Sequence, residues 1–164
     1  MNLKNLKLTA LINAYSLVQI PLLGFITPRV VEATGTKSVV RVRLDRRTRN
    51  HLGVMYFGAL AMGAELSIAL RAITAIADSG QKIDFIFKDF SAEFLKRADG
   101  HVDFVCAQAK QVGDLIKRAA RSTDRLEKTF TGFAYVPANG KEPVMKYTLT
   151  LSVRNRTLKA KGTK

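Results

Sequence analysis

The sequence predicts an α+β domain in which five or six antiparallel strands wrap around one long central helix, with an extra helix at the N-terminus. Three observations carry this prediction. A long apolar run with helical periodicity covers about residues 55–78, an alternating strand pattern over 36–46 precedes it, and mainly strand patterns follow it. At 164 residues the chain has the length of one ordinary domain.

The N-terminal segment is apolar from residue 8 to residue 25. Polar residues and Pro21 interrupt this stretch, which disfavours a membrane span, and no small-residue cleavage site follows it, which disfavours a signal peptide. We therefore expect an amphipathic helix that packs on the domain. Its apolar positions are Leu8, Leu11, Ile12, Tyr15 and Val18.

Residues 36–46 alternate between apolar and charged side chains, which predicts a strand with one solvated face. The apolar face contains Val40, Val42 and Leu44. The following apolar run is expected to end at Ser79-Gly80, because glycine is the preferred residue just after a helix.

Four further strands are expected after the long helix. The segment 82–97 alternates, but its phase changes near Lys88-Asp89, which predicts a bulge. Asp99-Gly100 predicts a hairpin turn into a strand over 101–108. Residues 112–120 are interpreted as a short helix or an excursion, and two last strands are joined at 138–140.

A formal net charge of +14 predicts attraction to an anionic partner, which could be nucleic acid, anionic lipid or a phosphate-bearing small molecule. Residues 156–164 are interpreted as a solvated basic tail. Cys106 is the single cysteine, which excludes an intramolecular disulfide and favours a reducing, cytoplasmic location. His51 and His101 lie far apart in the chain, so we expect no metal site.

Glu65 is the one acidic residue within the apolar run 50–70. A carboxylate there would be partly desolvated, which raises its pKa. Either Glu65 lies on an exposed edge or in a structural hydrogen bond, or it is a general base or nucleophile in an apolar pocket. It shares a helical stripe with small or flexible residues, namely Gly58, Ala61, Met62, Ala69 and Ala72.

The motif Asn50-x-x-Gly53-x-x-x-x-Gly58, with Glu65 seven residues later, resembles the signature of hotdog-fold acyl-CoA thioesterases, particularly the phenylacetyl-CoA type. A second segment, residues 92–100, resembles the strand and turn of that family. The resemblance covers roughly residues 35–154 and implies a single hotdog domain. We expect a helical extension over 1–30, a core over 35–155 and the basic tail over 156–164.

The resemblance also implies roles for individual residues. Glu65 would act as general base or nucleophile, and Asn50 would orient a water or hold the loop. The backbone N–H of Phe57, together with that of its catalytic neighbour Gly58, would polarise the thioester carbonyl. Tyr56 stands where the family has histidine and would contact substrate together with Gly53. Lys96 and Arg97 would bind the phosphates of coenzyme A.

The leading functional hypothesis is therefore a thioesterase that acts on acyl-CoA or acyl carrier protein. The implied site lies between subunits, so a homodimer, or a dimer of dimers, is expected, with no cofactor except the coenzyme A of the substrate. A non-catalytic protein that binds acyl thioesters is the first alternative. Binding of nucleic acid or another anionic surface ranks third, because charge alone supports it.

Overall fold

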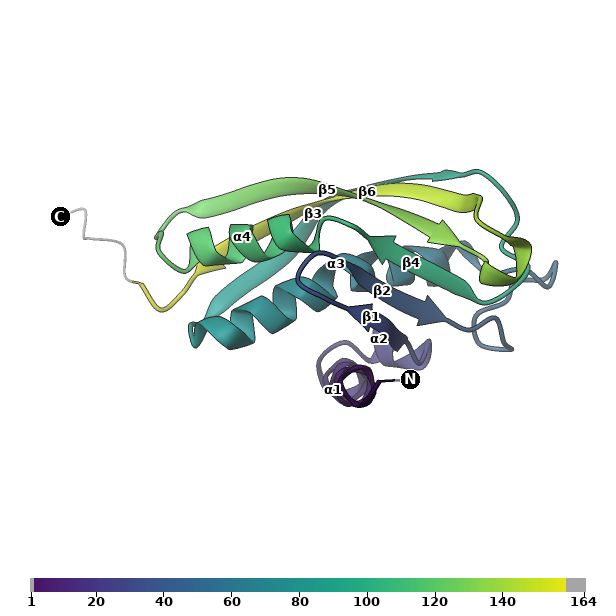
Figure 1. The fold of residues 1–164 in the computed structure, drawn as a ribbon, viewed down its shortest axis with the longest axis horizontal. Coiled ribbons are helices and arrows are strands. Elements are labelled where there is room, and N and C mark those ends of the chain that lie inside the picture. Colours follow the sequence, from purple (N-terminus) through teal and green to yellow (C-terminus); the bar gives the residue numbers. More distant parts are fainter. Residues whose placement is uncertain (1, 159–164) are drawn as a thin grey trace.

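The computed structural model describes residues 2–158, which form one antiparallel sheet wrapped around a long helix (Figure 1). The strand order in the sheet is β1-β2-β4-β5-β6-β3. The strands are β1 (Arg29–Ala33), β2 (Ser38–Val42), β3 (Ile83–Phe94), β4 (Val102–Cys106), β5 (Arg125–Tyr135) and β6 (Pro143–Asn155). The helices are α1 (Leu3–Gln19), α2 (Pro21–Phe25), α3 (Phe57–Ser79) and α4 (Ala109–Ala119), with a 3-10 turn at Pro137–Asn139. The predicted fold class is confirmed.

Helix α3 is the centre of the core. It is long and apolar enough to cross a membrane, but 61% of its most apolar 18-residue stretch is buried inside the domain, so it is the core helix. Gly80 ends it in the left-handed conformation with φ 65°, as the sequence predicts. The helix lies close to the sheet at Gly63, where an added Cβ would come 2.2 Å from the ring of Phe104 on β4.

Strand β3 forms an edge of the sheet, because β6 is its one hydrogen-bonded neighbour among residues 2–158. The register between β3 and β6 shifts between Phe87 and Asp89, which confirms the predicted bulge. The Asp89 carboxylate accepts a hydrogen bond from the Thr150 N–H at 3.1 Å there. Three large side chains of β3 are exposed, namely Ile86, Phe90 and Phe94.

The prediction of a hairpin at Asp99-Gly100 is wrong. Strand β4 pairs with β2 and β5, whereas β3 lies at the far edge of the sheet, so residues 95–101 form a crossover. The face of residues 36–46 that was predicted to be solvated is half-buried in β2, because Val39 is buried and the Arg41 guanidinium donates two hydrogen bonds to the Asp103 carboxylate at 2.6 and 2.7 Å. Strand β1 and helix α2 were not predicted.

Helix α1 packs against β1 through its polar residues as well as its apolar ones. The Asn13 amide donates to the Pro28 carbonyl at 2.8 Å, and the Thr9 hydroxyl accepts from the Val30 N–H at 2.9 Å. Of the apolar face predicted for this helix, Ile12 is buried and Leu8 half-buried, but Leu11, Tyr15 and Val18 are exposed, so that part of the prediction is wrong. The polar residues that interrupt the apolar N-terminal stretch therefore attach α1 to the sheet. Of the predicted basic tail, residues 159–164 lie outside the described residues.

Candidate active site

The loop before α3 is held by the residues that the motif singles out. The Asn50 side-chain oxygen accepts a hydrogen bond from the Leu52 N–H at 2.9 Å, and the Asn50 N–H donates to the Val54 carbonyl at 2.8 Å. Gly53 has φ 77°, a backbone conformation that favours glycine. These contacts give Asn50 and Gly53 a role in the shape of the loop.

The start of α3 presents free backbone donors. The N–H groups of Met55 and Tyr56 donate to the carbonyls of Ala98 at 2.8 Å and Thr48 at 2.7 Å. Among residues 2–158 no side chain caps the helix, and the first intrahelical bond is donated by the Leu60 N–H to the Tyr56 carbonyl. The N–H groups of Phe57, Gly58 and Ala59 therefore lie at the positive end of the helix dipole without an intrahelical acceptor.

Two aromatic rings flank these donors. The rings of Tyr56 and Phe57 make an edge-to-face contact with centroids 5.1 Å apart, and both side chains are exposed. The Tyr56 ring lies over Gly58, where an added Cβ would meet it at 2.5 Å. Gly58 therefore makes room for the ring of Tyr56 at the helix start.

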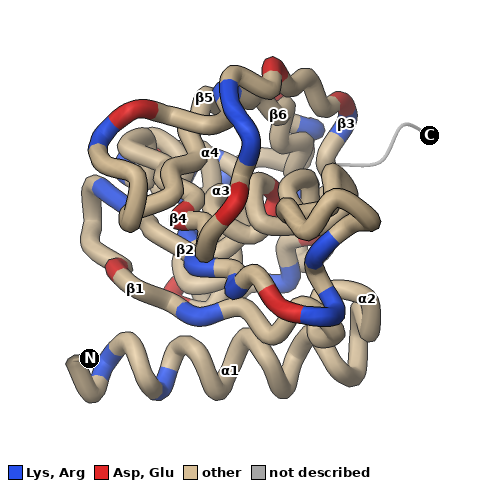
Figure 2. The backbone as a smooth tube through the Cα atoms, turned by 90° about the vertical axis from the view of Figure 1, so that its right-hand side faces the viewer, with Lys and Arg blue, Asp and Glu red and all other residues tan. Residues whose placement is uncertain are grey.

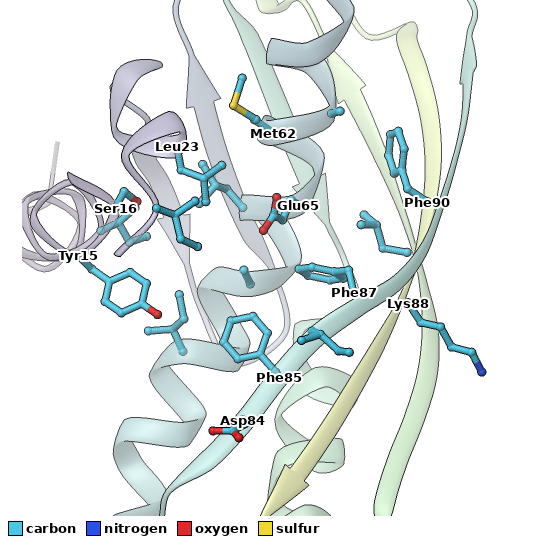
Figure 3. Close-up of a pocket in the computed structure, with 18 of the residues that line it drawn as sticks. Tyr15, Ser16, Leu23, Met62, Glu65, Asp84, Phe85, Phe87, Lys88 and Phe90 are labelled. Carbon is cyan, nitrogen blue, oxygen red and sulfur yellow. The ribbon is translucent and has the colours of Figure 1, made fainter. Parts of the chain in front are cut away.

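Glu65 lies in the middle of α3 and faces a cavity of about 890 Å³ (Figure 3). Its side chain is half-buried, and this burial raises the pKa of its carboxyl above the ordinary value of 4.5. Within residues 2–158 it makes no ion pair or side-chain hydrogen bond. Helices α1 and α2 form one wall of the cavity and β3 forms the opposite wall; lining residues include Ile12, Tyr15, Ile20, Leu23, Met62, Phe85, Phe87 and Phe90.

A single chain does not bring Glu65 to the start of its own helix. The two positions are eight residues apart on α3, which is about 12 Å along the axis at 1.5 Å per residue. The acid and the free N–H groups of one chain are therefore separated along the helix.

Lys96 and Arg97 are exposed and lie next to the start of α3, because Ala98 accepts the hydrogen bond from Met55. Lys96 forms an ion pair with Glu142, so part of its charge is already compensated. Arg97 has no ion pair or side-chain hydrogen bond among the described residues and is the freer of the two cations.

The wall formed by Tyr15, Ile20 and Leu23 was missed by sequence reasoning. The apolar periodicity of the N-terminal helix predicts that it packs on the domain, but it does not say that the contact encloses a cavity beside Glu65. Cys106 is a buried free thiol, and burial raises its pKa.

The element order and the sheet topology place the chain in the hotdog class. Solved structures of similar fold support this assignment. A candidate thioesterase from Shewanella oneidensis is 10% identical, with 89% of this chain and 96% of that one covered and a TM-score of 0.74. A protein of unknown function from Pseudomonas aeruginosa, described as a probable thioesterase, is 21% identical over 90% and 96% of the two chains, with a TM-score of 0.72. A thioesterase from Haemophilus influenzae is 16% identical over 93% and 94%, with a TM-score of 0.64.

Within that class, residues 9–153 match the family described as Domain of unknown function (DUF4442), and the chain belongs to this family. None of the curated proteins matches the chain. The structural similarity to these proteins shows the hotdog fold, which the motif around Asn50 and Gly58 predicts. At identities of 10–21% it shows the fold alone and not a particular branch of the class.

Proposed function

We propose that this protein hydrolyses acyl thioesters, with coenzyme A or acyl carrier protein as the thiol part, in the cytoplasm. The observation that carries the proposal is Glu65, a desolvated acid without a partner in the described part of its own chain, which faces a largely apolar cavity. Such a carboxylate resembles a general base, because its raised pKa brings it closer to the pH at which it must accept a proton.

The site requires two copies of the chain. The free edge of β3 and the exposed Ile86, Phe90 and Phe94 offer a surface on which a second copy could continue the sheet. In a two-fold dimer the start of α3 in one copy would lie opposite Glu65 of the other copy. The second copy would then supply the backbone N–H groups, which in the same chain lie about 12 Å from Glu65 at a rise of about 1.5 Å per residue.

The chemistry follows from these two elements. The Glu65 carboxylate takes a proton from a water molecule, and the oxygen of that water attacks the thioester carbonyl carbon. The carbonyl oxygen becomes an oxyanion that accepts hydrogen bonds from the N–H groups of Phe57 and Gly58 of the second copy. The C–S bond breaks, and Glu65 returns its proton to the leaving thiolate, which yields a carboxylic acid and a thiol.

The cavity suits the acyl part of such a substrate. Its walls are mainly aliphatic and aromatic, and its volume of about 890 Å³ lies in the range of small-molecule sites. Arg97, beside the start of α3, is placed to bind a phosphate of coenzyme A, and Lys96 would do so only when released from Glu142. Tyr56 and Gly53 would shape the side of the site next to the carbonyl.

An acyl-CoA panel with detection of the released thiol tests the proposal. We expect turnover by the wild type, a loss of about 100- to 10,000-fold in Glu65→Gln, and little change in Glu32→Gln, whose half-exposed carboxylate on β1 pairs with Lys37 away from the cavity. Undiminished turnover in a folded Glu65→Gln variant would refute the role of Glu65. Saturable binding of acyl-CoA without any turnover would instead identify a binding protein for acyl thioesters.

A further inference from the structure

The outer surface of the N-terminal helices is unusually apolar. Eighteen large hydrophobic side chains are exposed in the described chain, and nine of them lie within the first 25 residues. Leu3 is 66% exposed, Val18 76% and Leu22 64%. We call this surface the outer face; its apolar members are Leu3, Leu6, Leu11, Leu17 and Val18 on α1, and Leu22 and Phe25 on α2.

Helix α1 is apolar on two opposite sides. Its inner side contains Ile12 and contacts β1 and the cavity, whereas Leu11 and Val18, seven residues apart, share the outer side. A contiguous exposed apolar patch of this kind marks a surface that contacts another protein or a membrane. Because no element of the described chain covers the outer face, a further partner is expected there.

The charge of this segment indicates the kind of partner. Residues 1–31 contain no aspartate or glutamate, and Lys4 and Lys7 are exposed on the same helix as the outer face. Figure 2 shows α1 along one side of the molecule, with both lysines near its amino end. Exposed leucine and valine side chains beside two lysines, in a segment without acidic residues on a chain of net charge +14, suit contact with the apolar boundary and the phosphates of an anionic bilayer.

We propose that the outer face of α1 and α2 binds the surface of an anionic phospholipid membrane. The apolar side chains would enter the boundary between headgroups and acyl chains, and Lys4 and Lys7 would contact the lipid phosphates. A second copy of the chain is a poorer partner, because two such faces would bring lysines together without any carboxylate to pair with them. The exposed side chains at the β3 edge form a different surface, which the proposed dimer would cover.

This membrane contact is independent of the proposed hydrolysis, but the two would share one structural element. The inner sides of α1 and α2 line the cavity beside Glu65, and their outer sides form the outer face. Membrane binding would therefore place the wall of the cavity directly on the lipid surface.

Vesicle flotation tests the proposal. The full chain is mixed with vesicles of phosphatidylcholine and phosphatidylglycerol, or with vesicles of phosphatidylcholine alone. The wild type should float with the anionic vesicles, and Leu11→Glu/Val18→Glu should bind at least about tenfold more weakly. Lys4→Gln/Lys7→Gln should lose about fivefold for each lysine and respond less to added salt.

The matched control is Lys110→Glu, on the exposed side of α4 and away from α1 (Figure 1), which lowers the net charge by two, as Leu11→Glu/Val18→Glu does. It should keep most of the vesicle binding. Failure of the wild type to float, or equal losses in the control and in Leu11→Glu/Val18→Glu, would overturn the proposal. A change in oligomeric state caused by Leu11→Glu/Val18→Glu would overturn it as well, in favour of a second copy. Turnover of a soluble acyl-CoA is measured separately and does not enter this test.

Discussion

Replacing Phe57 with proline should remove one backbone N–H from the start of α3 and leave the helix intact. Phe57 is the first helical residue, where proline is well tolerated because that N–H has no intrahelical acceptor. The preceding residue, Tyr56, has φ −64° and ψ 140°, a conformation that a following proline favours. The Phe57 side chain is 59% exposed, so its loss removes little packing.

The expected loss of activity is large for so small a change. An N–H that stabilises the oxyanion typically contributes about 100- to 1,000-fold in kcat. Phe57→Leu retains the N–H but removes the aromatic ring, so it is the matched control. We expect Phe57→Pro to lose thioesterase turnover by that factor, with a melting temperature close to that of Phe57→Leu.

Mixing two inactive variants tests whether the site is shared between chains. Random pairing of Glu65→Gln with Phe57→Pro makes half of the dimers mixed, and each mixed dimer regains one intact site of two, so about one quarter of wild-type activity should return. If the acid and the N–H acted within one chain, every site would keep one defect and no activity would return. Absence of recovery after verified subunit exchange would refute the intersubunit site, and full activity of Phe57→Pro would refute the donor.

Three further changes probe ionisation, packing and the loop. Because burial raises the folded-state pKa of Glu65, the wild type should lose stability as pH rises from the ordinary 4.5 through that raised pKa, with a slope of at most about 1.4 kcal/mol per pH unit. Urea unfolding of Glu65→Gln should not show this pH-dependent loss of the free energy of unfolding. The kcat/KM of the wild type should rise over the same pH range, because the Glu65 carboxyl becomes ionised there. Gly63→Val should lower the free energy of unfolding by about 1–3 kcal/mol, since a Cβ there meets the buried Phe104 ring; an unchanged urea midpoint would contradict the close contact. Gly53→Ala should cost about 1–2 kcal/mol in the same assay, because φ is 77° and no atom lies within 4 Å of the added Cβ.

Local patterns identified the elements whose signals are strong within their own residues. The end of α3 at Gly80 and the bulge near Lys88 depend on backbone preferences and on side-chain alternation, which the sequence displays directly. The turn at Asp99-Gly100 is also a local signal, but a turn does not determine which strand is paired next. The partner of β3 is β6, some sixty residues further along the chain, and that choice depends on packing around the whole helix.

The candidate site also contains some residues that local sequence signals identify and others that depend on contacts between distant residues. The lone acid Glu65 is visible in the sequence because it departs in type from its apolar surroundings, whereas Asn50 and Gly53 are singled out by the resemblance of their motif to that of hotdog-fold thioesterases. Strand β1 was missed because it is five residues long and follows Pro28 directly. The contribution of Tyr15 and Leu23 to the cavity was missed because it depends on how α1 is attached to β1 by hydrogen bonds between distant residues.

The open edge of β3 has a consequence for the isolated chain. Strand β3 is twelve residues long and pairs with β6 on one side, so its outer edge, with three exposed aromatic or aliphatic side chains, forms a template on which another extended segment could add as a new strand. A substitution that separates the copies without lowering the protein concentration should therefore favour precipitation through this edge, and the bulge between Phe87 and Asp89 would limit how far such a stack could grow.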